Sequence, residues 1–138
     1  MKGKEEVQIM VNEIRKCVQL EKYVTKIMLG LGVPAHLGGY RYIREAILIS
    51  ITDMEAVNRV TKYLYPEIAE MYNTTPSKIE RAIRTAIEAS WARGSREVME
   101  EIFGYSSASG RKRPTNSEYI AGIADKVRLD YKGNILVS

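Results

Sequence analysis

Several residue types that form catalytic sites, metal sites or disulfides are almost missing. The 138 residues include one cysteine, one histidine, one tryptophan and one phenylalanine. A single cysteine, Cys17, excludes an internal disulfide, and no Cys or His stands near it at a zinc-ligand spacing. The single histidine, His36, lacks a Ser, Cys or carboxylate pair at a catalytic spacing, so a local hydrogen bond is the simpler interpretation. We therefore expect no enzyme, no metal site and no cofactor.

A long hydrophobic run is also missing. The most apolar stretch, AILISITDMEAV, reaches Asp53 and Glu55 well before a membrane could be crossed. At the N-terminus, Glu5 and Glu6 occupy the place where an export signal needs apolar residues. These features predict a cytoplasmic protein without a membrane partner.

Strand signals are equally scarce, because Val, Ile and Thr do not alternate along the chain except weakly in the tail NILVS. Apolar residues instead recur at helical spacing, which predicts an all-α, compact bundle of about six or seven helices. Glycine and proline mark a turn over 30–40 and a loop over 104–114. The helices are expected at 5–29, 42–51, 51–65 with Thr52 or Asp53 as N-cap, 66–72, 76–91, 95–103 and from 115 onward, where Thr115 and Glu118 have capping-box spacing.

One pair of these helices has the pattern of a helix-turn-helix. Ala69 allows a close approach, and Asn73 stands at the turn, where a residue tolerant of positive φ is needed. Apolar contacts across the pair are expected from Ile68, Tyr72, Ile79 and Ala82. Thr75 should cap the second helix, with Pro76 in its first turn. In such motifs the start of the second helix enters the DNA major groove.

The cations in the sequence gather around this second helix. The net charge is only +4, but Arg81 and Arg84 lie opposite the apolar face of Ile79 and Ile83, with Lys78 along one edge. Arginine can bind guanine through two acceptors and a carboxylate can accept from cytosine, so Arg81 and Glu80 are the predicted base-reading residues. Phosphate or groove-edge contacts are predicted for Thr74, Thr75, Ser77, Lys78, Arg84, Arg111, Lys112 and Arg113.

A simpler interpretation stays open for both cationic groups. Arg81 could pair with Glu88 on the helix surface, an interaction worth only ~0.3–0.5 kcal/mol. The segment 111–113 could equally be a solvated connection without a ligand.

Four longer blocks closely resemble the C-terminal effector domain of the stage-zero sporulation response regulator, the master regulator of endospore formation. They are GVPAHLGGYRYIREAI, LYPEIAEMYNTTPSKIERAIRTAIEASWARG, IFGY and RPTNSEYIAGIADKVRL. The resemblance covers about 27–131. It implies an all-helical domain of a bacterial, nucleoid-associated transcription regulator that binds double-stranded DNA at a TGTCGAA-like box, often as two head-to-tail copies.

The resemblance also implies roles for particular residues. Family positions matching Ser77, Lys78, Glu80, Arg81 and Arg84 touch DNA, with Glu80 and Arg81 on bases. Lys78 stands where Arg is usual, which keeps the charge but loses the bidentate hydrogen bonding of a guanidinium. The segment 94–105 resembles a surface that engages the sigma subunit of RNA polymerase, with Val98, Glu100 and Phe103 as candidate contacts.

The N-terminal residues depart from the family, whose members carry an α/β receiver domain. We expect 1–26 to form a helical extension and 27–138 the DNA-binding effector domain. The chain is interpreted as a stand-alone paralogue rather than an excised domain, without control by phosphorylation. The extension could pack on its own domain or pair with a second copy. An alternative function is a protein-interaction module that antagonises a full-length regulator or binds the sigma subunit.

Overall fold

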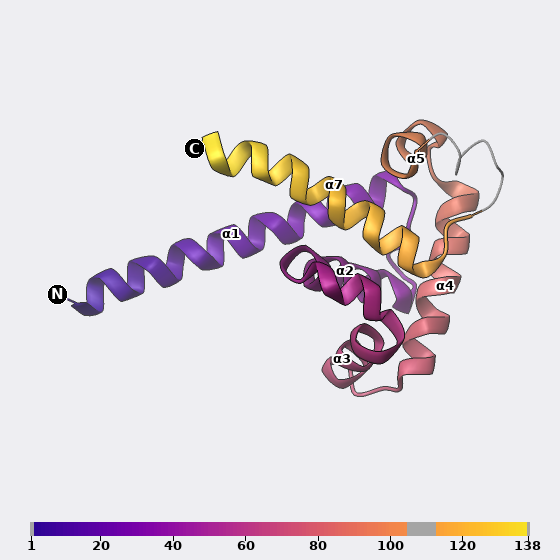
Figure 1. Ribbon diagram of the computed structural model, residues 1–138, viewed down its shortest axis with the longest axis horizontal. Helices are drawn as coiled ribbons and strands as arrows, with labels where there is room; N and C mark the ends of the chain where they lie inside the picture. The colour runs from indigo at the N-terminus through magenta and orange to yellow at the C-terminus, as the bar shows by residue number, and fades with distance from the viewer. Residues whose placement is uncertain (1, 105–112, 138) are drawn as a thin grey trace.

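The computed structural model describes residues 2–104 and 113–137, and the side chains within 3–104 and 113–131. These parts contain six α-helices and no strand, which confirms the all-α prediction (Figure 1). They are α1 (Lys2–Gly30), α2 (Gly38–Thr52), α3 (Tyr65–Met71), α4 (Pro76–Arg93), α5 (Arg96–Phe103) and α7 (Asn116–Val137). None of the described helices combines the length and apolarity needed to span a membrane.

Three segments differ from the sequence-based expectation. Helix α2 begins at Gly38, not at residue 42, and includes two glycines that the pattern had placed in a turn. The helix expected over 51–65 is a 3₁₀-helix (Met54–Arg59) followed by a π-helix (Val60–Leu64), with a backbone break at Arg59 (φ −128°, ψ 46°). The strand-like tail is helical as far as Val137.

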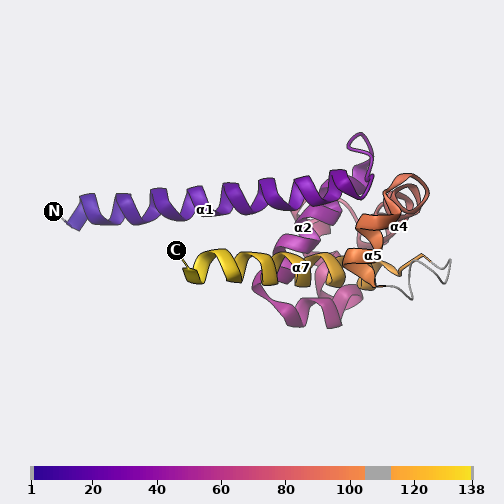
Figure 2. The ribbon, with the colours of Figure 1, turned by 90° about the horizontal axis from the view of Figure 1, so that it is seen from above.

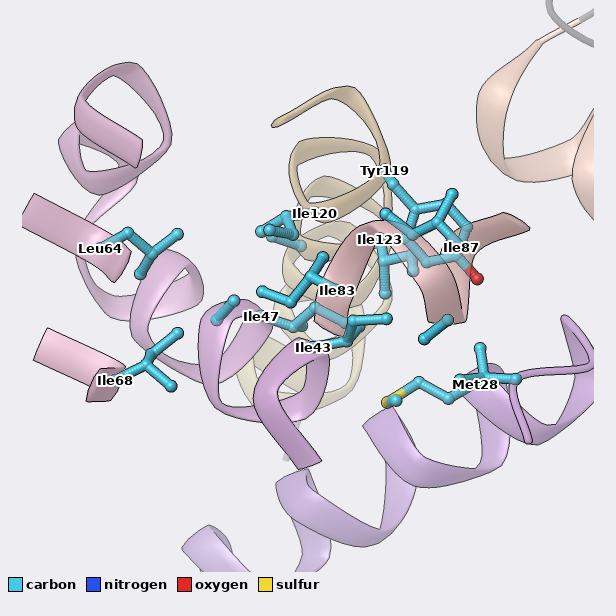
Figure 3. Packing of buried hydrophobic residues seen from close by; sticks show 14 of the residues in the cluster. Met28, Ile43, Ile47, Leu64, Ile68, Ile83, Ile87, Tyr119, Ile120 and Ile123 are labelled. Carbon is cyan, nitrogen blue, oxygen red and sulfur yellow. The ribbon is translucent and has the colours of Figure 1, made fainter. Parts of the chain in front are cut away.

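The hydrophobic core lies where α1, α2, α4 and α7 meet (Figure 3). Isoleucine dominates it, with fully buried side chains on α2, α4 and α7 that interlock around the centre of the domain. The labelled members are Met28, Ile43, Ile47, Leu64, Ile68, Ile83, Ile87, Tyr119, Ile120 and Ile123. Burial of a side chain of this size stabilises a fold by about 1.5–3 kcal/mol, so this cluster accounts for much of the hydrophobic driving force.

A close approach between backbones fixes α4 against α2. A Cβ placed on Gly39 would lie 2.1 Å from the carbonyl oxygen of Ala82 and 2.8 Å from the Cβ of Ala86. No larger residue fits there unless the two helices separate. Gly39 is thus required inside α2 by the packing of α4, although glycine disfavours helix by about 1 kcal/mol relative to alanine.

A buried hydrogen-bond chain fixes the other half of α4. The Ser90 hydroxyl donates to the carbonyl oxygen of Leu31 and accepts from the hydroxyl of Tyr119, both at 2.7 Å. Burial raises the pKa of Tyr119, so its hydroxyl stays protonated and available as the donor. These hydrogen bonds connect α4 with the end of α1 and with α7. Together with the contact at Gly39, they fix α4 at both ends of its buried face.

Helices α1 and α7 extend from the body side by side, with both termini on the same side of the molecule (Figures 1 and 2). At their base the Tyr23 hydroxyl donates to Asp130, which lowers the pKa of that carboxyl group, and Lys126 pairs with both Asp130 and Glu101. Beyond this joint the first part of α1 is exposed to solvent. The helix passes residue 26, the expected domain boundary, without a break.

Candidate nucleic-acid interface

The turn between α3 and α4 has the backbone geometry that the sequence predicts. Asn73 has φ 52°, and it is the one residue other than glycine with positive φ in the described chain. The amide of Thr74 donates to the carbonyl of Ala69 at 2.9 Å and that of Asn73 to Glu70 at 3.4 Å. This pair of bonds is the Schellman motif, which satisfies the last carbonyls of α3 and reverses the chain direction. The prediction for Asn73 is confirmed.

The start of α4 is built by local capping. The side-chain oxygen of Thr75 accepts from the backbone amide of Lys78 at 3.4 Å, and Pro76 occupies the first helical position. The Ser77 hydroxyl lies 3.4 Å from that of Thr75. Thr75, Ser77 and Lys78 are exposed, whereas Thr74 is half-buried in the turn. Hydroxyls, an ammonium group and the positive end of the helix dipole therefore face solvent together, an arrangement that suits anions.

One edge of α4 is open. Lys78, Arg81 and Thr85 follow one another at three- and four-residue spacing along the exposed side. Within the described residues, neither the Lys78 ammonium nor the Arg81 guanidinium has a carboxylate at ion-pair distance. In particular, Glu88 does not pair with Arg81, because it is engaged by Arg113 at 3.2 Å. Arg81 is thus available to a ligand.

The other edge of α4 faces the segment 113–117, which leads into α7 and is here called the α7 entry segment. Glu80 and Arg84, four residues apart, form an ion pair of 3.1 Å with side chains 39% and 47% exposed. Arg113 pairs with Glu88 one turn further along. An open cleft lies between the edge and the entry segment, lined by Tyr65, Glu80, Arg84, Arg113, Pro114, Thr115, Asn116 and Ser117. The two predicted base-reading residues therefore differ. In the part of the chain that the structure describes, Arg81 has no ion-pair partner, whereas Glu80 is paired with Arg84.

Sequence reasoning missed Asn116, which is one of the residues that line this cleft. Its side-chain amide donates to the hydroxyl of Tyr65 at 3.0 Å and to the backbone carbonyl of Glu80 at 3.2 Å. Tyr65 is itself buried at the start of α3, and burial raises the pKa of its hydroxyl. The sequence contains one related signal, the capping-box spacing of Thr115 and Glu118, and both of its reciprocal hydrogen bonds are present.

The remaining predicted residues fall into two groups. Arg111 and Lys112 lie outside the described residues, so their phosphate contacts stay predictions. On α5, Phe103 stacks on Tyr119 with ring centroids 5.1 Å apart and covers Gly122, while Val98 packs partly against the core. Glu100 is half-exposed on the same helix. The structure assigns no partner to this surface, and no group of metal-binding side chains gathers among the residues that it describes.

The fold and site together define an all-helical, helix-turn-helix protein whose second helix presents cations at its start. Residues 24–127, which are 104 of the 138, match the family model of the sporulation initiation factor Spo0A C terminal. The chain belongs to this family. It is accordingly a DNA-binding effector domain of the sporulation-initiation type, a class of transcription regulator.

Proposed function

We propose that the chain binds double-stranded DNA sequence-specifically at a TGTCGAA-like box by placing the N-terminal half of α4 in the major groove. The observation that carries the proposal is Arg81, whose guanidinium has no carboxylate at ion-pair distance among the described residues. It lies on the open edge of a helix whose opposite face is fixed by Gly39 and Ser90. A rigid support matters because base contacts depend on a defined position of the side chain.

The side chains of the interface divide into two functions. Arg81 binds guanine through O6 and N7, and the Glu80 carboxylate accepts from a cytosine amino group. Phosphates are bound by the hydroxyls and cations around the helix start and along its edges, which fix the domain on the duplex without reading sequence. This second group comprises Thr74, Thr75, Ser77, Lys78, Arg84 and Arg113, together with Arg111 and Lys112. Binding by the 138-residue chain is proposed to require no phosphorylation.

The test is a titration of the Arg81→Ala variant on a box-containing duplex and on a scrambled duplex. Loss of one guanine contact should weaken binding to the box by about 1–3 kcal/mol and leave the scrambled duplex much less affected. Arg93→Ala is the matched control, since it removes the same charge from the last turn of α4, roughly 18 Å along the helix. Equal binding of the unmodified protein to both duplexes would reject base recognition.

A second function is favoured by one specific observation, the exposed apolar side of α1. Val7, Met10, Ile14 and Val18 are 44–57% exposed and recur at three- and four-residue spacing. We propose that this stripe pairs with α1 of a second copy, because the spacing is that of a two-helix seam. The same broad side of α1 carries Val24 and Met28, which are buried in the body. Contact with a full-length regulator or a sigma subunit is the alternative use of these surfaces.

A further inference from the structure

The start of α7 contacts the recognition helix at the residue that is proposed to read cytosine. Besides its bonds to Tyr65 and to the carbonyl of Glu80, the Asn116 amide lies 3.5 Å from the Glu80 carboxylate oxygen Oε2. That same oxygen forms an ion pair with the Arg84 guanidinium, at a distance of 3.1 Å. Glu80 is therefore held from two sides, by a neutral donor on another helix and by a cation on its own.

The position of the Asn116 amide is itself fixed. Asn116 is the first residue of α7, whose N-cap Thr115 exchanges two hydrogen bonds with Glu118. One turn further, Tyr119 and Ile120 are fully buried in the core. The amide therefore approaches α4 from a rigid part of the domain, and it contacts α3 through Tyr65 at the same time. One side chain connects both helices of the helix-turn-helix with α7.

We propose that Asn116 is a positioning residue for base recognition: its amide orients the Glu80 carboxylate. Asn116 acts through Glu80, with no need to touch DNA itself. The inference rests on the proposed function, because Glu80 must read a base for its orientation to matter. It assigns a specificity-determining role to a residue 36 positions away from the base reader.

The variant that tests this role is Asn116→Asp. Aspartate has nearly the same shape but cannot donate, so a carboxylate would face the carbonyl oxygen and the carboxylate of Glu80. An acidic residue in the first turn favours the helix, so the variant does not weaken the start of α7. The matched control is Ser117→Asp, which places the same charge one residue further along the entry segment without removing this donor.

Both variants should lose affinity for all duplexes to a similar extent, because each adds one negative charge near phosphate. Only Asn116→Asp should also lower the ratio of box to scrambled binding, by about fivefold or more. The loss should be confined to the base pair that Glu80 reads, as shown by duplexes substituted at one position at a time. An equal ratio for Asn116→Asp and Ser117→Asp would overturn the inference.

A double-mutant cycle with Glu80→Ala separates positioning from a general structural effect. If Asn116 acts through Glu80, Asn116→Asp should change the binding ratio no further in the Glu80→Ala background. A similar loss in both backgrounds, or a Glu80→Ala variant with unchanged specificity, would contradict the role. These outcomes differ from failure of the proposed function, which is an unmodified protein that does not distinguish the box from scrambled DNA.

Discussion

At the scale of single residues, Lys78 and Arg84 carry the same charge on the same helix but differ in their partners. The Arg84 guanidinium is neutralised in part by Glu80 at 3.1 Å, whereas Lys78 has no carboxylate at ion-pair distance in the described chain. A cation that already has a partner releases less free energy on meeting a phosphate, because the first pair must be broken or shared. Lys78 should thus contribute more to phosphate binding than Arg84.

This difference predicts how binding depends on salt. Lys78→Ala should lower affinity for box and scrambled duplexes alike and reduce the slope of log K against log salt by about 0.9, the value for one phosphate contact. Arg84→Ala should reduce the slope less. Fluorescence anisotropy across a salt series measures both slopes, with Lys22→Ala on exposed α1 as the control for lost charge. An unchanged slope for Lys78→Ala would contradict its assignment to phosphate.

Residues whose structure depends on near neighbours were predictable from sequence. Asn73 at the turn, Thr75 as N-cap and the Thr115–Glu118 capping box all form within a few positions, and each is present as expected. The contact of Asn116 with Glu80 was not predictable, because it joins residues 36 positions apart and no repeating pattern connects them. The contacts of this site that could not be predicted from the sequence are those between residues far apart in the chain.

At the scale of elements, the packing of α2 on α4 predicts the effect of a single methyl group. Gly39→Ala should destabilise the fold by about 1–3 kcal/mol or more, because the new Cβ meets the Ala82 carbonyl at 2.1 Å and backbone cannot move aside as a side chain can. Urea unfolding measures the loss. In Gly38→Ala the atom nearest to the new Cβ is 3.9 Å away, so this change at the neighbouring position should not lower the free energy of unfolding. Equal stability of the two variants would contradict the close approach.

The same contact explains why element boundaries were only partly predictable. Two adjacent glycines signal a turn from local propensity, yet α2 includes both, because its approach to α4 leaves no room for a side chain at Gly39. Caps and hydrophobic spacing located α3, α4 and α5 to within a residue or two. The 3₁₀ and π segments between Met54 and Leu64 have no local signal that we can identify.

At the scale of the whole molecule, the exposed stripe of α1 predicts self-association. The unmodified chain should show twice its 15.7 kDa mass by light scattering as concentration rises, whereas Ile14→Glu should stay monomeric, because a charge in an apolar seam is costly to bury. Asn12→Glu adds the same charge on the opposite side of α1 and should associate normally. A monomeric unmodified protein at every concentration would exclude this pairing.

Selection of bound duplexes from a random pool is the most direct test of the central claim that α4 reads base sequence. The unmodified protein should enrich a TGTCGAA-like box, and Arg81→Ala should relax the preference at one guanine while retaining the others. A pool that stays random after selection, or a motif that is identical for Arg81→Ala and the unmodified protein, would contradict the account.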